Sequence, residues 1–182
     1  EVTYPTGTFT VDDPYRWLPT LGEIDMHLIA EGRHEQLWDV LGAHVRTYDT
    51  PGGSVTGTAF AVWAPNARGI RIAGDFNWWD GVALPMRSLG STGVWELFVP
   101  DVQAGARYKL HVLGADGRWR EKADPFAFAT EVPPGWASVV FESAYDWQDA
   151  EWLDQRSRTR WDAAPMSIYE VHLASWRQGL SY

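Results

Sequence analysis

The sequence predicts an all-β fold, a β-sandwich, from three observations. Short runs of strand-forming residues recur along the middle of the chain, residues typical of turns separate them, and several runs alternate apolar with polar side chains. Strands of this length and spacing are typical of two antiparallel sheets packed face to face. The predicted strands are 58–63, 70–73, 94–99, 107–113 and 138–141.

The stretch 57–81 is the centre of this pattern. Its two predicted strands, 58–63 and 70–73, are separated by a break that contains Pro65 and Gly69. A polar loop follows, GDFNWWDG at 74–81, which holds three aromatic residues. Tryptophan offers a flat apolar face and one N–H donor. Such a ring suits a pyranose, which is apolar on its faces and polar at its rim.

The later predicted strands separate side chains expected in the core from side chains expected at the surface. Within 107–113, Tyr108, Leu110 and Val112 share one side of the strand, while Lys109 and His111 share the other. The run Ala115-Asp116-Gly117 predicts a hairpin turn, and Trp119 follows it. Three other aromatic residues are expected in the core, namely Trp63, Trp95 and Phe76.

The flanking segments give weaker patterns. We expect a helix over 34–41, with Gly42 just past its end, and then a polar connection over 44–56. The charged segment 146–161 is interpreted as a linker with one helical turn at most. A new strand is predicted over 166–173. A further possible strand lies at 8–11.

Composition narrows the classes of function. The net charge of −9 argues against a phosphate-neutralising surface for nucleic acid, and no apolar run approaches the ~20 residues that span a bilayer. The chain has no cysteine, which excludes disulfides and thiolate sites and suits a cytoplasmic protein. The histidines lack metal-ligand spacing. We therefore expect no metal, no cofactor, no nucleic acid and no membrane partner.

Two motifs resemble a known family. FAVWAPNA (60–67) and GDFNWWDG (74–81) resemble carbohydrate-binding modules of family 48, which implies an immunoglobulin-like β-sandwich. Three further segments resemble glycogen (1,4-α-glucan) branching enzymes, in which this module precedes a catalytic (β/α)8 barrel. These segments are 14–44, ADPFAFATEVPP (123–134) and MSIYEVHLASWR (166–177).

This resemblance implies a domain division. The end of a preceding domain occupies 1–43, the sandwich 44–145, a linker 146–164, and the first strand of a truncated barrel 165–182. Such enzymes transfer α-1,4-glucan segments to form α-1,6 branches, with catalytic carboxylates from later barrel strands. We therefore expect no catalytic residue in this chain. Its expected partners are an α-1,4-glucan such as glycogen and the catalytic barrel of the same protein.

The resemblance also implies site residues. Trp79, Trp119 and Lys109 occupy motif positions that in glycogen-binding relatives stack on glucose rings or bond to hydroxyls. Trp78 would widen this surface. In the alternative interpretation, Trp119 packs against the barrel and Lys109 is merely solvated. The family's glycogen binders also carry an asparagine near the last strand, where this chain reads PGWAS at 134–138.

Two other functions remain open from the sequence. One is a stand-alone glycogen- or starch-binding module, against which the barrel-like motif at 166–177 argues. The other is the N-terminal part of a different enzyme of the α-amylase superfamily, either debranching or trehalose-releasing. The motifs at 123–134 and 166–177 favour branching over these.

Overall fold

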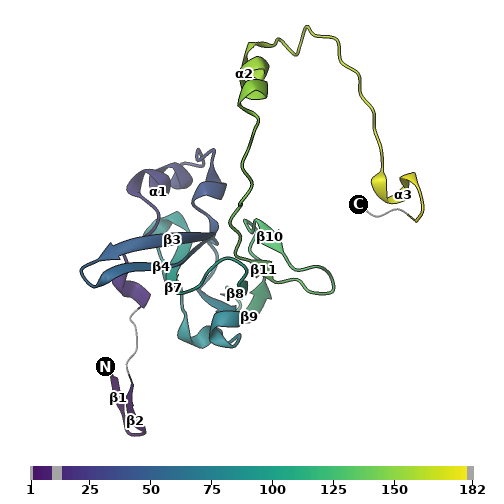
Figure 1. Ribbon diagram of the computed structural model, residues 1–182. Helices are drawn as coiled ribbons and strands as arrows, with labels where there is room; N and C mark the ends of the chain where they lie inside the picture. The colour runs from purple at the N-terminus through teal and green to yellow at the C-terminus, as the bar shows by residue number, and fades with distance from the viewer. Residues whose placement is uncertain (1, 10–13, 180–182) are drawn as a thin grey trace. The chain divides into compact units, whose positions relative to one another are not determined.

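The computed structural model describes residues 2–9 and 14–179, and the chain divides into two compact units, Glu1–Ser143 and Ala144–Tyr182. The first unit contains two antiparallel sheets that enclose a common apolar core (Figure 1). The β-sandwich predicted from the sequence is confirmed. At the start of the chain, β1 (Val2–Tyr4) and β2 (Gly7–Phe9) form a two-stranded hairpin of their own.

The two sheets have simple neighbour orders. The first sheet runs β3 (Gly42–Thr50), β4 (Gly53–Trp63), β7 (Val94–Pro100) and β6 (Arg87–Ser88). The second sheet runs β10 (Ala129–Thr130), β11 (Ser138–Val139), β8 (Arg107–Leu113) and β5 (Gly69–Gly74), and β9 (Trp119–Lys122) also pairs with β8. Short 3-10 helices lie in the connections: η3 (Asp75–Asn77), η4 (Gly81–Ala83) and η5 (Gly90–Thr92).

Alternation of side chains builds the core. On β4 and β7, Phe60, Val62 and Leu97 point inward, and they meet Ile72 and Tyr108 from the second sheet. The Phe60 and Tyr108 rings meet edge to face, with centroids 4.9 Å apart. Full burial of such side chains stabilises the fold by about 1.5–3 kcal/mol each. Lys109 and His111 alternate with these inward residues on β8, so their side chains lie on the outer face.

Residues 14–41 cover the outer face of the first sheet. This segment contains η1 (Pro14–Arg16), α1 (Glu23–Ala30) and η2 (Leu37–Asp39). Trp17 packs against Tyr48 and Phe98, with centroids 5.4 and 5.0 Å away. The fully buried Glu96 carboxylate accepts hydrogen bonds from Thr20 and pairs with Arg87. The division between domains at residues 43 and 44 stays a prediction.

Two predictions about the flanks are wrong. The helix of this region is α1, whereas the predicted helix over 34–41 contains only the three-residue η2. Gly42 has a φ of 101° and begins β3 instead of ending a helix. The predicted polar connection over 44–56 is a β-hairpin of β3 and β4. The sequence of this hairpin is polar because β3 is an edge strand with one side exposed to solvent. On that exposed side the hydroxyl groups of Thr47 and Thr56 form a hydrogen bond of 2.8 Å between the two strands.

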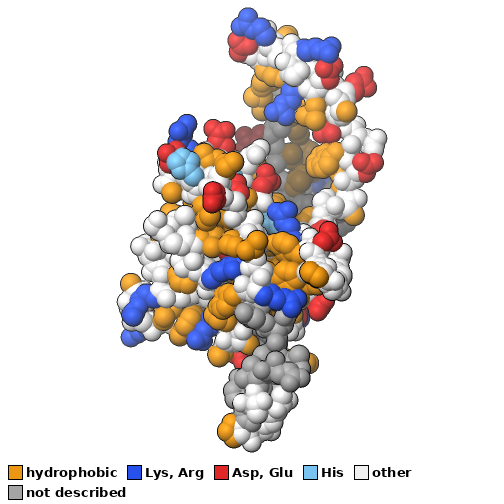
Figure 2. Space-filling view, turned by 90° about the vertical axis from the view of Figure 1, so that its left-hand side faces the viewer, with side chains coloured by type: hydrophobic (Ala, Val, Ile, Leu, Met, Phe, Trp, Pro, Cys, Tyr) orange, Lys and Arg blue, Asp and Glu red, His pale blue; other side chains and the backbone are white. Residues whose placement is uncertain are grey.

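Of the three aromatic side chains expected in the core, two pack there and one does not. Trp95 and Phe76 pack against the core as expected. Trp63 does not, since its side chain is 54% exposed and its indole donates to the Thr92 carbonyl at 3.1 Å. The reason is register: Val62 points into the core, so its neighbour on the strand must point outward. Figure 2 shows one face of the molecule, where hydrophobic side chains gather with Lys and Arg side chains among them.

The second unit contains two helices and no strand among its described residues, 144–179. The helix α2 (Ala150–Arg158) is longer than the single turn expected in the linker. The strand predicted over 166–173 is absent: residues 165–172 are irregular and α3 (Leu173–Trp176) follows. A strand needs a neighbour to pair its backbone groups, and this unit supplies none in its described part. Nowhere in the described residues is a helix both long and apolar enough to cross a membrane.

Candidate carbohydrate-binding site

The loop after β5 is held by one asparagine. The Asn77 side chain accepts a hydrogen bond from the Gly74 N–H at 2.8 Å and donates to the carbonyls of Ile72 and Asp80 at 3.0 and 2.9 Å. Gly74 is required for a different reason, since a Cβ there would collide with the Arg107 carbonyl oxygen. Polar and small residues of the GDFNWWDG motif therefore fix the loop that presents the tryptophans.

Both tryptophans of this loop adopt left-handed backbone conformations. Trp78 has a φ of 54° and Trp79 a φ of 61°. Bulky residues rarely occupy this region, and such strain persists only where the surroundings impose it. The Trp78 side chain is 93% exposed, whereas Trp79 is 36% exposed. Strained backbone conformations cluster at functional sites, so a strained loop that exposes large apolar rings is a candidate binding site.

Lys109 lies at the centre of the candidate site. Its ammonium group is 5.6 Å from the centroid of the Trp79 ring and 3.5 Å from the centroid of the Trp136 ring. It also forms an ion pair with Glu121 at 3.1 Å. The two rings therefore flank one ammonium group on the outer face of the second sheet. We call Trp79, Lys109 and Trp136 the aromatic platform.

Trp119 lies at a different position on the same sheet. It pairs with Leu113 at the far end of β8, and the cation over its ring is Arg71, whose guanidinium carbon is 4.1 Å from the centroid. His111 and Glu121 form the next cross-strand pair on the same face of the sheet, two positions along β8 and β9. The structure thus brings Trp79 to Lys109, and pairs Trp119 with Arg71 instead. The Trp119 side chain remains 42% exposed.

Trp136 was not among the residues predicted from the sequence. It precedes β11, which pairs with β8 through Ser138 and Tyr108. That register brings Trp136 to Lys109, the neighbour of Tyr108 on β8. The signal available in the sequence was the PGWAS segment at 134–138, where a tryptophan follows Pro134 and Gly135 in a turn-forming stretch. The ring is 45% exposed.

An ion cluster lies beside the platform. Arg107 donates to both oxygens of Asp75 at 2.9 Å and to Glu131 at 3.0 Å. The hydrogen bond from Arg107 holds the pKa of Asp75 below its ordinary value, and the Trp79 indole contributes in the same direction. The Ala137 N–H and Arg107 likewise lower the pKa of Glu131, and both carboxylates raise the pKa of Arg107. The cluster is therefore fully ionised at neutral pH.

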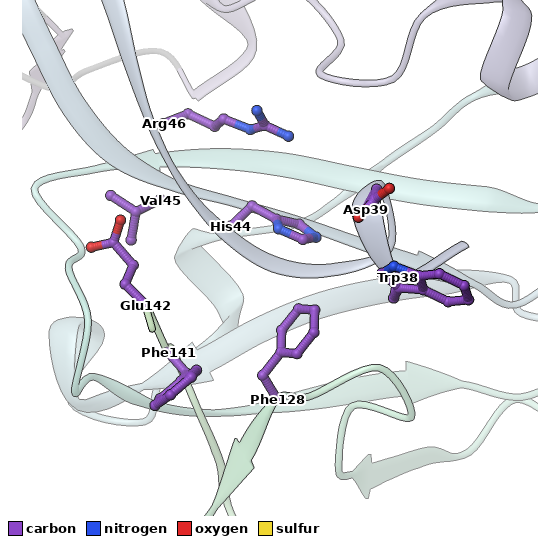
Figure 3. Close-up of a pocket in the computed structure, with 8 residues that line it drawn as sticks. All are labelled: Trp38, Asp39, His44, Val45, Arg46, Phe128, Phe141 and Glu142. Atoms are coloured by element: carbon purple, nitrogen blue, oxygen red, sulfur yellow. The ribbon is translucent and has the colours of Figure 1, made fainter. Parts of the chain in front are cut away.

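A hollow of about 450 Å³ lies elsewhere on the first unit. Figure 3 shows the Phe128 ring beside the His44 imidazole, with Trp38 and Asp39 to the right of these rings and Phe141 and Glu142 to the left. The two rings meet edge to face, and His44 bonds to the Leu41 carbonyl at 2.9 Å, so both serve local packing. Over 2–9 and 14–179, no three His, Cys, Asp or Glu side chains cluster as a metal site would require.

A match to a family model agrees with the β-sandwich. Residues 40–127 match the family described as carbohydrate-binding module 48 (isoamylase N-terminal domain). A solved structure with partial likeness is ligand-free PulA from Klebsiella pneumoniae, 22% identical with a TM-score of 0.44, over 56% of this chain and 9% of that one.

Curated relatives match over the full length of this chain. The 1,4-alpha-glucan branching enzyme GlgB of Thermobifida fusca is 68% identical, and that of Frankia casuarinae is 67% identical, each over 100% of this chain. The chain spans 24% and 22% of their lengths, about a quarter. Residues 40–127 therefore belong to the carbohydrate-binding module 48 family, and the whole chain is homologous to the N-terminal part of 1,4-alpha-glucan branching enzymes.

Proposed function

We propose that this chain is the glucan-binding N-terminal part of a glycogen branching enzyme. The observation that carries the proposal is the aromatic platform, where Trp79 and Trp136 flank Lys109 on a module of a carbohydrate-binding family. Apolar ring faces match the C–H faces of glucose units, and an ammonium group donates to their hydroxyls. A neutral polysaccharide also suits a chain with a net charge of −9.

The whole protein, by this proposal, cleaves an α-1,4-glucan and transfers the segment to a 6-hydroxyl, as its homology to branching enzymes supports. Enzymes that retain anomeric configuration use two carboxylates about 5–5.5 Å apart, one as nucleophile and one as acid and base. We assign neither to this chain, so its own role is to hold glucan near the catalytic barrel. A cytoplasmic location, with no membrane or nucleic-acid partner, belongs to the same proposal.

Three segments are part of the proposal as well. Residues 165–182 are proposed to supply the first strand of the barrel once the barrel itself pairs with them, and exposed apolar side chains there, such as Ile168 and Tyr169, would be covered by that barrel. Residues 146–164 link it to the sandwich, and residues 1–43 end a preceding domain.

Trp78 and Trp119 extend the platform as secondary contacts, Trp78 because it is almost fully exposed.

The test is binding to glycogen by affinity electrophoresis beside thermal melting. Wild-type chain should be retarded by glycogen in the gel. Trp79→Ala and Trp136→Ala should each weaken binding by up to about a hundredfold, because aromatic stacking is worth ~1–3 kcal/mol. Trp79→Asn should bind as weakly as Trp79→Ala, since asparagine tolerates the left-handed backbone and only the ring is lost.

The matched control is Trp152→Ala. Trp152 is 53% exposed on α2, with Arg156 over its ring at 5.3 Å, so it resembles the platform residues chemically but lies in the second unit. It should migrate like wild type. If the platform variants also migrate like wild type, or if they fail only because they melt far earlier, the proposed site is wrong.

A further inference from the structure

One arginine connects the two loops that carry the platform tryptophans. Arg107 lies at the start of β8, between the loop that bears Trp79 and the loop that bears Trp136. Its side chain reaches Asp75 with two hydrogen bonds of 2.9 Å, from Nε and Nη2 to the two carboxylate oxygens. Its backbone N–H donates to Asp75 as well, at 3.1 Å. Asp75 opens η3, so the Trp79 loop is fixed to β8 through this residue.

The remaining arm of the guanidinium reaches the other loop. Arg107 Nη1 donates to Glu131 Oε1 at 3.0 Å. The second oxygen of Glu131 accepts from the backbone N–H groups of Trp136 and Ala137, at 3.1 and 2.9 Å. A continuous series of hydrogen bonds therefore runs from Asp75 through Arg107 and Glu131 to the backbone of Trp136.

These loops need such a connection. Trp79 has a strained positive φ, and strained conformations relax unless neighbouring groups hold them. The 131–137 loop has two other backbone bonds within it, from Glu131 N–H to the Ala137 carbonyl and from Gly135 N–H to the Val132 carbonyl. Neither of these reaches the Trp79 loop. Among the described hydrogen bonds and ion pairs, Arg107 is the side chain that bonds to both loops.

The chemistry requires arginine at this position. A guanidinium presents a planar fork of donors, so it can bind one carboxylate with two parallel bonds and still donate to another. Lysine has a single charged nitrogen and cannot hold this geometry. Because the hydrogen bonds described for its side chain all go to the two carboxylates, Arg107 acts through the loops and is not itself assigned to the sugar.

We propose that Arg107 is a positioning residue, which sets the separation and orientation of Trp79 and Trp136 so that both rings meet one glucan chain. This inference rests on the proposed function, because it assigns the residue that shapes the same site. It predicts that glucan affinity depends on Arg107 far more than stability does. Exposed ion pairs contribute little to folding, whereas a displaced ring loses its stacking contact.

The experiment compares Arg107→Gln and Arg107→Lys with a matched control, Arg120→Gln. Arg120 forms a two-bond pair with Asp116 on the adjacent hairpin, at 2.9 and 2.5 Å, with a similarly exposed side chain, and bonds to neither tryptophan loop. The dissociation constant for maltoheptaose is measured by calorimetry and the melting temperature separately. Both Arg107 variants should bind about tenfold more weakly, which corresponds to 1.4 kcal/mol, and melt within a few degrees of wild type. The control should bind like wild type.

A ligand-free measurement separates this inference from the proposed function. In the absence of sugar, Arg107→Gln should shift the indole 1H–15N signals of both Trp79 and Trp136, and Arg120→Gln should shift neither. If wild-type chain does not bind maltoheptaose, the proposed function fails and the indole signals alone decide the role of Arg107. Unchanged indole signals, or wild-type affinity in Arg107→Gln, would overturn the proposal. Glu131→Gln should add no further loss to Arg107→Gln, since both interrupt one connection.

Discussion

The stability of the platform depends on a buried polar network beneath it. The Tyr108 hydroxyl, fully buried, donates to Asp124 Oδ2 at 2.6 Å. The other oxygen of Asp124 accepts from the Phe126 N–H at 2.9 Å, and the Asp124 N–H donates to the Ser138 hydroxyl oxygen at 2.9 Å. These bonds tie the segment after β9 to β8 and β11, next to Lys109 and Trp136.

Replacing Asp124 by alanine should destabilise the first unit strongly. The change leaves two donors without partners, the Tyr108 hydroxyl and the Phe126 N–H, and each unsatisfied buried donor costs about 1–3 kcal/mol. The expected loss is about 2–5 kcal/mol in the free energy of unfolding. At about 2–4 °C per kcal/mol for a domain of this size, the melting temperature should fall by roughly 5–20 °C.

Asparagine at the same position should be tolerated much better. Burial raises the pKa of Asp124, so the folded state holds the proton of this carboxyl group more readily than the unfolded state does. An amide is neutral and keeps an acceptor oxygen, and its expected cost is below about 1.5 kcal/mol. Because the pKa of Asp124 is higher in the folded state than in the unfolded state, ionisation of this group destabilises the fold. The destabilisation begins as the pH rises above the pKa that Asp124 has in the unfolded chain. The advantage of wild type over Asp124→Asn should therefore be largest in acid and shrink toward neutral pH.

The assay is urea unfolding followed by tryptophan fluorescence, at pH 4 and pH 7, for wild type, Asp124→Asn and Asp124→Ala. The midpoint should fall far for alanine and little for asparagine. The reasoning would be refuted by an alanine variant with the wild-type midpoint, or by an asparagine variant as unstable as alanine.

Three other predictions concern different parts of the chain. Amides of residues 168–172, which are irregular with exposed Ile168 and Tyr169 side chains, should exchange hydrogen rapidly, while those of β7 exchange slowly; equal protection in a monomer would contradict this. The Asp75 pKa is lowered, so its ion pair stabilises the fold above the ordinary carboxylate pKa and is lost as pH falls through the lowered value. The melting temperatures of wild type and Asp75→Asn should therefore converge in strong acid. A constant difference between the two melting temperatures at every pH would show that the ion pair is not the source of the stabilisation. Finally, the chain alone should leave the iodine colour of amylose unchanged, because we assign it no catalytic carboxylate; loss of colour would disprove that assignment.

Strand positions could be predicted where one face of the strand is buried. Residues 107–113 alternate because Tyr108 and Leu110 point inward and Lys109 outward, and β8 has the predicted bounds. The edge strand β3 gave no such signal, since Arg46, Thr47 and Asp49 expose polar side chains to solvent. This is why the sequence of β3 was interpreted as a polar connection.

Of the candidate site residues, the sequence placed two that the structure brings together and missed a third, Trp136. Trp79 and Lys109 were predicted from their motif positions, and in the structure the Lys109 ammonium group lies near the Trp79 ring. Trp136 comes from an irregular loop, and its approach to Lys109 follows from the pairing of Ser138 with Tyr108, 30 residues apart in sequence. Such long-range register, like the bonds from Arg107 to Asp75 and Glu131, is not encoded in any local pattern.

The account predicts that the aromatic platform itself contacts glucan. The most direct measurement is a 1H–15N spectrum of the indole groups of the 12 tryptophans, titrated with maltoheptaose. The signals of Trp79 and Trp136 should move together and yield one dissociation constant, while those of the buried Trp17 and of Trp152 stay in place. Movement confined to other tryptophans, such as Trp38 or Trp63, or no movement at all, would contradict the central claim.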